Sequence, residues 1–105
     1  MDLEKIKASM PNDVEIDKLT NLFKVLGDPT RAKILHTIED SELNVTSICD
    51  CVGMNKSAVS HQLRILKDAN LVKSRRDGKE VYYSFDDDHI STIFKFALEH
   101  IEEDR

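Results

Sequence analysis

The first third of the chain repeats apolar residues at helical spacing. Over residues 14–26 they recur every three or four positions, and Gly27 follows at a place where helices commonly end. Asp28 and Pro29 then supply a capping side chain and a proline suited to a first helical turn. We therefore predict one helix over this first segment and a second that runs from Pro29 to about Ile38.

The middle of the chain has the pattern of a helix-turn-helix unit. Residues 46–52 predict a short helix, and residues 56–69 predict a longer one whose apolar positions again fall on one side. Gly53-Met54-Asn55 separates the two, a turn of the length and type expected in such a unit. The second helix of the pair is therefore the candidate recognition helix.

Two strand-like runs follow this unit, residues 71–75 and 80–85, both rich in β-branched and aromatic residues. Asp77-Gly78 between them predicts a hairpin. The apolar stripe of residues 90–101 then predicts a terminal helix. Taken in this order, the elements predict a mainly α fold with a β-hairpin, which is a winged helix-turn-helix.

The length of the chain indicates how it is organised. At 105 residues it suits a single domain with a modest core, which a partner subunit would help to stabilise. We expect a flexible N-terminal arm over residues 1–13, which ends in turn-forming residues. Residues 14–105 would form the winged helix-turn-helix domain for DNA binding and dimerisation.

The absence of long apolar segments bears on the compartment. Neither the N-terminus nor any later window resembles a signal peptide or a membrane span. The two cysteines, Cys49 and Cys51, are too close together for an ordinary structural disulfide. We therefore expect a cytoplasmic protein that has no membrane contact.

Charge is distributed unevenly along the chain. The net charge of −5 argues at first against nucleic acid, because an acidic protein repels phosphate. Residues 56–79, however, contain seven basic and two acidic side chains. The predicted recognition helix and hairpin can therefore present a basic surface on an otherwise acidic body.

This basic segment also contains short polar side chains that suit contacts with base edges. In the major groove we place Ser57, Ser60 and His61, with Gln62 as a candidate for an adenine contact if it faces outward. The basic side chains suit contacts with the phosphate backbone of double-stranded DNA. They are Lys56, Arg64, Lys73, Arg75, Arg76 and Lys79.

Several of these segments together resemble the ArsR/SmtB family of metal-responsive repressors. They are Leu26-Gly27-Asp28-Pro29-Thr30-Arg31, Ser60-His61-Gln62-Leu63-Arg64-Ile65-Leu66-Lys67, Leu71-Val72 and the Arg-Asp-Gly-Lys hairpin. The resemblance covers residues 16 to 103. It implies a homodimer that represses metal efflux or sequestration genes from an inverted-repeat operator and leaves the DNA when metal binds.

The terminal helix contains a candidate metal-ligand set, Asp87 and His89 at one end and His100 and Glu103 at the other. Two imidazoles and two carboxylates suit tetrahedral zinc. The two histidines are about 16 Å apart along one helix, so a single helix cannot bind one ion with both pairs. Antiparallel packing of two subunits would reunite the pairs in two intersubunit sites.

The same four positions match the pattern of the zinc-sensing branch of the family. Zinc is therefore the expected regulatory ion, and cobalt or cadmium are further ions that could bind in vitro. The resemblance also suggests that His100 donates its second ring N–H to backbone near Asn70, which would connect the metal to the segment after the recognition helix.

Alternatives remain open at this point. The thiolate pair of the cadmium, lead and arsenic sensors is missing, because Asn44 and Thr46 follow Glu-Leu here. Cys49 and Cys51 are expected to be one buried and one less buried thiol, but they could sense redox state or a thiol-reactive metal. A zinc enzyme and a winged helix that contacts proteins are weaker hypotheses, so we expect neither a catalytic activity nor a small organic substrate.

Overall fold

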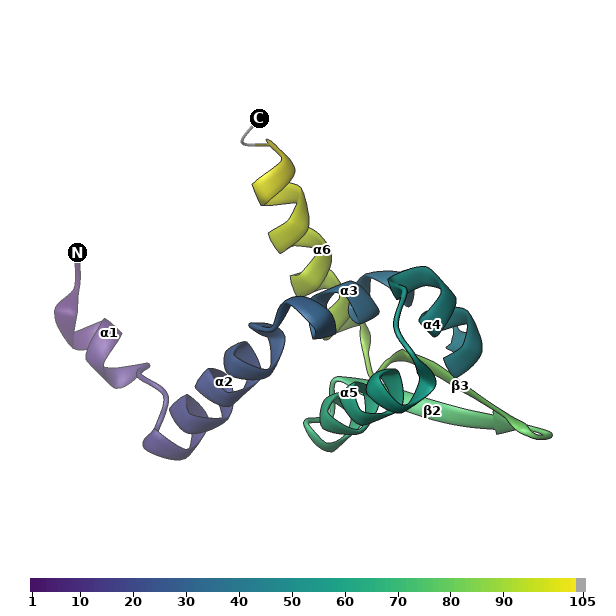
Figure 1. Ribbon diagram of the computed structural model, residues 1–105. Coiled ribbons are helices and arrows are strands. Elements are labelled where there is room, and N and C mark those ends of the chain that lie inside the picture. Colours follow the sequence, from purple (N-terminus) through teal and green to yellow (C-terminus); the bar gives the residue numbers. More distant parts are fainter. Residues whose placement is uncertain (104–105) are drawn as a thin grey trace.

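The computed structural model describes residues 1–103 and shows a winged helix-turn-helix from which several helices project (Figure 1). This is the fold that the hydrophobic pattern of the sequence predicts. In chain order the elements are α1 (Leu3–Ala8), α2 (Asp13–Leu26), α3 (Pro29–Thr37), β1 (Leu43–Asn44), α4 (Val45–Val52), α5 (Lys56–Asp68), β2 (Val72–Asp77), β3 (Glu80–Phe85) and α6 (Asp88–Glu103).

Short polar side chains begin the helices of the central unit. Asp28 accepts a hydrogen bond from the backbone N–H of Arg31 and thereby caps α3, while Asn44 and Asn55 cap α4 and α5 in the same way. Gly53 ends α4 in the left-handed conformation, with φ +70°. The helix-turn-helix is thus defined by local signals on both sides of its turn.

The sheet is antiparallel with strand order β1-β3-β2. Asp77 pairs with Glu80, so the two turn residues are Gly78 and Lys79. Of these two only Gly78 has a positive φ, as in a type II′ turn with glycine in first place. Strand β1 was not predicted, because its two residues are too short to show any alternation.

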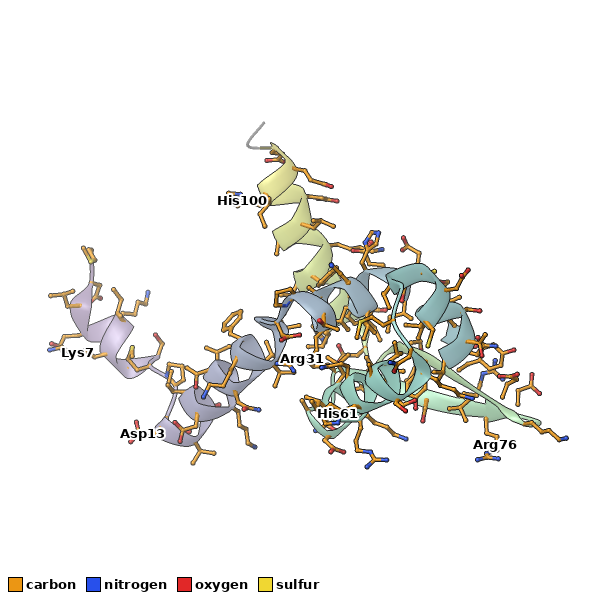
Figure 2. The ribbon with its side chains drawn as sticks, viewed as in Figure 1. Lys7, Asp13, Arg31, His61, Arg76 and His100 are labelled. Carbon is orange, nitrogen blue, oxygen red and sulfur yellow. The ribbon has the colours of Figure 1, made fainter. Side chains whose placement is uncertain are left out.

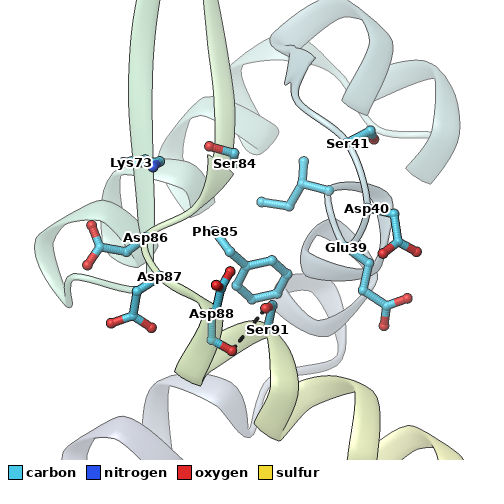
Figure 3. Close-up of a pocket in the computed structure, with 11 residues that line it drawn as sticks. Glu39, Asp40, Ser41, Lys73, Ser84, Phe85, Asp86, Asp87, Asp88 and Ser91 are labelled. Atoms are coloured by element: carbon cyan, nitrogen blue, oxygen red, sulfur yellow. Dashed lines mark hydrogen bonds between the residues drawn. The ribbon is translucent and has the colours of Figure 1, made fainter.

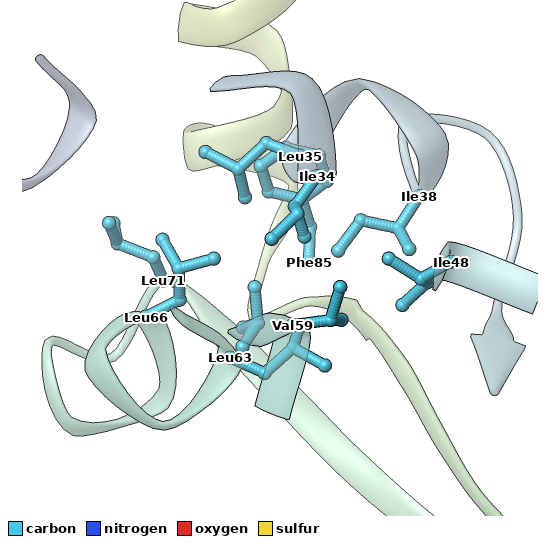
Figure 4. Close-up of a cluster of buried hydrophobic side chains, with 10 residues drawn as sticks. Ile34, Leu35, Ile38, Ile48, Val59, Leu63, Leu66, Leu71 and Phe85 are labelled. Carbon is cyan, nitrogen blue, oxygen red and sulfur yellow. The ribbon is translucent and has the colours of Figure 1, made fainter. Parts of the chain in front are cut away.

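The core lies where α3, α4 and α5 pack against the base of the hairpin (Figure 4). Each of these elements contributes apolar side chains that are at most 8% exposed. The buried set is Ile34, Leu35, Ile38, Ile48, Val59, Leu63, Leu66, Leu71, Val72 and Phe85. Burial of one such side chain stabilises the fold by about 1.5–3 kcal/mol, so this cluster fixes the recognition helix on its scaffold.

The outer helices lack such burial. In α1, α2 and α6 no residue of the described chain is fully buried, although each helix carries apolar side chains. The radius of gyration is 16.5 Å, against about 13 Å for a compact domain of this length. The chain therefore projects apolar helices from a small core, as Figure 1 shows for α1, α2 and α6.

The predicted N-terminal arm contains a short helix that the sequence pattern does not predict. Residues 3–8 form α1, capped by Asp2, and Asn12 forms a capping box with Glu15 at the start of α2. All of residues 1–13 are exposed. Within residues 1–103 no helix has both the length and the apolar composition needed to cross a bilayer.

Candidate nucleic-acid interface and metal ligands

Helix α5 presents a polar, basic face away from the core. Val59, Leu63 and Leu66 are buried on its inner side. The exposed side chains lie on the other side and include five of the predicted DNA contacts: Lys56, Ser57, Ser60, His61 and Arg64. Because Asn55 caps the helix, the first three positions of this face stand at a defined N-terminus, the part of a recognition helix that reads base edges.

Gln62 lies on a different side of α5 and does not meet the condition that it faces outward. Its side chain is half-buried, and its Oε1 accepts a hydrogen bond of 3.2 Å from Nη1 of Arg31. The Nε of Arg31 also donates to the backbone carbonyl of Val25, at 2.7 Å. Arg31 therefore joins the end of α2, the start of α3 and the recognition helix.

The two faces of strand β2 have different surroundings. Val72 is buried, and Ser74 accepts a hydrogen bond of 2.7 Å from Nζ of Lys67 in α5. This is the face toward α5, and alternation along the strand places Arg76 on the same face. Figure 2 shows Arg76 and His61 on the same side of the molecule. Lys79 is exposed in the turn that follows.

Lys73 and Arg75 lie on the opposite face of the strand. The guanidinium of Arg75 binds the Glu42 carboxylate through Nη2 at 2.7 Å and through Nε at 3.1 Å, and it stacks 5.1 Å from the centre of the Tyr82 ring. The hydrogen bond from Arg75 lowers the pKa of Glu42 below its usual value of 4.5. The predicted phosphate contacts of the hairpin are thus divided between two faces.

Lys73 lines a pocket of about 330 Å³ between the end of α3, the sheet and the start of α6 (Figure 3). Asp86 and Asp87 lie on one side of Phe85 in this pocket, and Glu39 and Asp40 lie on the other. Its carboxylates therefore do not converge on one point.

The first pair of predicted metal ligands lies at the start of α6. Oδ1 of Asp87 accepts a hydrogen bond of 3.0 Å from the backbone N–H of Ile90, so this side chain caps the helix. Its Oδ2 is 3.8 Å from Nδ1 of His89, whose side chain is 92% exposed. Asp87 and His89 are thus side by side and accessible.

The second pair, His100 and Glu103, is exposed at the far end of the same helix, where Figure 2 shows His100 projecting from α6. Among residues 1–103 of one chain, no three histidine, cysteine, aspartate or glutamate side chains come together in a way that could bind a metal ion. The two predicted ligand pairs, here called half-sites, are thus separate within one subunit, and the predicted four-ligand site requires a second subunit.

Both histidines lie on the exposed apolar face of α6. Positions 93, 96 and 100 lie four, seven and eleven residues after position 89, so all four positions share one side of the helix. Ile93 and Phe96 on this side are 42% and 65% exposed. The two half-sites therefore frame an apolar surface that has no partner within the described chain.

The cysteines differ in burial as the sequence predicts, but neither is fully buried. Cys49 is half-buried and packs against the core, whereas Cys51 is exposed, and both are free thiols. Sequence reasoning missed the residues that connect elements, namely Arg31, Glu42 and the ion pair of Asp40 with Lys95. The local pattern offers no signal for them beyond their charge.

Comparison with known proteins gives this site a context. The pattern of the family described as "Bacterial regulatory protein, arsR family" matches residues 28–74. The transcriptional repressor SmtB homolog of Synechocystis sp. is 35% identical over 96% of this chain and 79% of its own length. A homolog of the cadmium resistance regulatory protein CadC from Staphylococcus aureus is 36% identical over 81% of this chain and 71% of its own.

Among solved structures, a homodimeric winged helix-turn-helix DNA-binding domain from Mycobacterium bovis, a possible ArsR-family regulator, superposes with a TM-score of 0.82. It is 26% identical to this chain, and the match covers 90% of this chain and 91% of that one.

Fold, exposed recognition helix and relatives together define a DNA-binding transcriptional regulator rather than an enzyme. The chain belongs to the ArsR family of bacterial regulatory proteins, in the ArsR/SmtB group of metal-responsive repressors.

Proposed function

We propose that this protein is a cytoplasmic zinc-responsive repressor, which binds an inverted-repeat operator as a homodimer and leaves it when zinc fills two intersubunit sites. The observation that carries the proposal is the placement of two exposed half-sites at the ends of one apolar helix face. Release from the operator would derepress genes for metal efflux or sequestration.

DNA binding is assigned to the exposed face of α5 and the adjoining face of the hairpin. Ser57, Ser60 and His61 would read base edges from the N-terminal half of α5. The phosphate contacts would come from Lys56, Arg64, Arg76 and Lys79, which are all exposed. Gln62 is not included in this proposal, because Arg31 binds its amide oxygen.

Dimerisation would bring the half-sites together. If two α6 helices pack antiparallel, Asp87 and His89 of one subunit meet His100 and Glu103 of the other when the two-fold axis passes near residue 95. Ile93 and Phe96, on either side of this point, are exposed in one subunit and would be buried there. The Mycobacterium bovis relative is itself a homodimer, which supports this arrangement.

The donor atoms favour zinc. Two imidazole nitrogens and two carboxylate oxygens fit four-coordinate Zn²⁺, and cobalt accepts similar ligands. The four proposed ligands include no thiolate, the donor that softer metal ions prefer. Zinc would supply only charge and geometry at this site, since a closed set of four ligands leaves no open position for catalysis.

Release requires that zinc bind the free conformation better than the DNA-bound one. Ions that join the α6 helices would fix the angle between subunits and with it the spacing of the two recognition helices. His100 would pass this constraint on through its second ring nitrogen toward backbone near Asn70. Asn70 has a positive φ of 61°, so the chain bends sharply where α5 ends.

The test is a titration of apo-protein with a labelled duplex selected from a random-sequence pool, repeated with zinc, cobalt, nickel and cadmium. We expect zinc to weaken binding of the wild type by tenfold or more, which corresponds to about 1.4 kcal/mol of coupling. His100→Asn should bind the duplex equally well and fail to respond to zinc.

The matched control is His36→Asn, because His36 is also an exposed histidine but lies on α3, outside the ligand set. This variant should respond to zinc like the wild type. Undiminished release of His100→Asn by zinc would contradict the ligand assignment.

A second candidate inducer is a thiol-reactive metal or an oxidant that acts on Cys51. The exposure of this thiol and the cadmium-resistance name of the Staphylococcus aureus relative support it. A Cys49→Ser/Cys51→Ser variant distinguishes the candidates: it retains zinc release if α6 is the sensor and loses release by cadmium or oxidant if the thiols are.

A further inference from the structure

Besides the backbone pairing of β1 with β3, an ion pair joins the middle of the hairpin to the rest of the fold. Arg75 in the middle of β2 binds both carboxylate oxygens of Glu42, in the segment between α3 and β1. Its guanidinium also packs over the ring of Tyr82, its partner across the strand pair. A planar guanidinium that is bound by a carboxylate fork and an aromatic ring has a defined orientation.

The segment that carries Glu42 is itself connected to the scaffold. Ile38 is 1% exposed in the core, and Oδ1 of Asp40 lies 2.5 Å from Nζ of Lys95 in α6. Glu42 is therefore a fixed point relative to the helices. Arg75 therefore joins the middle of β2 to a connected part of the fold, next to the pairing of β1 with β3.

The next residue along β2, Arg76, is placed differently from Arg75. Arg76 lies on the face of β2 toward α5, on the same side as His61, whereas Arg75 lies on the far face. A phosphate that contacts Arg76 would therefore approach from the side that Arg75 does not face.

We propose that Arg75 is a positioning residue, which binds Glu42 and thereby holds the hairpin so that Arg76 and Lys79 meet the DNA backbone. This inference rests on the DNA-binding part of the proposed function and does not depend on the metal. Arg75 itself makes no phosphate contact in the complex.

The sharpest test is Glu42→Gln, because two explanations predict opposite signs. This variant removes a negative charge from an acidic protein, so electrostatic attraction alone predicts tighter DNA binding. Tighter binding is also expected if Arg75 itself contacts a DNA phosphate and Glu42 competes with that phosphate for Arg75. Loss of the hairpin anchor predicts weaker binding, by up to about fivefold, because exposed ion pairs contribute modestly to stability.

The matched control is Asp50→Asn on the exposed side of α4, which removes the same charge at a site away from the hairpin. It should leave binding unchanged or slightly tighter. Urea unfolding of each variant ensures that affinity is compared between folded proteins.

A mutant cycle with Arg76→Gln separates positioning from a general structural effect. In the wild type this change should lower the salt dependence of binding by about one ion. In the Glu42→Gln background it should cost clearly less, because a displaced hairpin no longer brings Arg76 to phosphate. The charge-exchanged pair Glu42→Arg/Arg75→Glu should restore much of the affinity.

The outcomes distinguish this inference from the proposed function. No salt-dependent DNA binding by the wild type would overturn both. Normal binding by the wild type, together with Glu42→Gln binding as tightly or more tightly, or additive costs of Glu42→Gln and Arg76→Gln, would overturn only the positioning role of Arg75.

Discussion

At the scale of single residues, Arg31 connects three helices by two hydrogen bonds. It donates to the carbonyl of Val25 at the end of α2 and to Gln62 in the middle of the recognition helix. Its own backbone N–H is bound by the cap residue Asp28. One side chain thus fixes the orientation of the projecting helix relative to the DNA-binding helix.

Replacement of Arg31 by alanine should therefore reduce both stability and operator affinity. We expect a loss of about 1–3 kcal/mol in the free energy of unfolding, measured with urea, since a hydrogen bond from a charged donor is broken and a part-buried carbonyl is left without it. Lys33→Ala, an exposed cation on the same helix, is the control and should change stability by less than about 0.5 kcal/mol. Equal effects of the two changes would contradict the bridging role.

The pH dependence of stability at Glu42 follows from its ion pair. Arg75 lowers the pKa of Glu42 in the folded chain below the value of 4.5 expected in the unfolded chain. Its contribution to stability is therefore complete above the unfolded pKa and is lost as the pH falls through the folded pKa. The stability difference between wild type and Glu42→Gln should be present at about pH 7 and shrink by about pH 3, as urea unfolding can show. A difference that does not change with pH would contradict this.

At the scale of elements, α6 combines a helix cap, an apolar face and both proposed half-sites. Asp87 caps the helix through the N–H of Ile90 and is also a proposed ligand. Metal binding at this end would therefore act directly on the start of the helix.

Phe96→Glu should separate the dimer without unfolding the subunit. The side chain is 65% exposed in one chain, so a charge is tolerated there, but it would be buried against its symmetry mate in the proposed dimer. We expect the dimer dissociation constant, measured by analytical ultracentrifugation, to rise by tenfold or more. Thr46→Glu on the exposed side of α4 adds the same charge and should leave dimerisation unchanged. A dimer of Phe96→Glu as tight as that of the wild type would place the interface elsewhere.

The sequence was sufficient for most elements because their signals are local. The caps Asp28, Asn44 and Asn55 each act three residues ahead, and the buried side of α5 repeats at helical spacing. The contacts that orient these elements are not local. Arg31 meets Gln62 over 31 positions, and Arg75 meets Glu42 over 33, so no spacing rule predicts them.

The candidate site also has one part that local sequence pattern predicts and another that it does not. The exposed residues of α5 followed from periodicity, but the two faces of the hairpin depend on strand register, which Asp77 and Glu80 fix through the position of the turn. Without that register, the sequence pattern predicts a single set of phosphate contacts, made of Lys73, Arg75, Arg76 and Lys79. The ligand pairs of α6 remain a prediction that a single subunit cannot test.

At the scale of the whole molecule, the chain measures 55 × 35 × 20 Å, and its projecting helices bury no residue fully. Much of the stability of α2 and α6 should then come from association. We expect the thermal midpoint to rise with protein concentration, measured by circular dichroism over a hundredfold range. A midpoint independent of concentration would indicate a subunit that is stable alone.

The exposed apolar face of α6 also bears on how the protein would act at low copy number. Where dimers dissociate, their concentration depends on the square of the subunit concentration, and only a dimer can occupy both halves of a symmetric operator. A twofold fall in the number of chains would then reduce occupancy by up to fourfold. Gene dosage and dilution at cell division would thus alter transcription even when the supply of metal is constant.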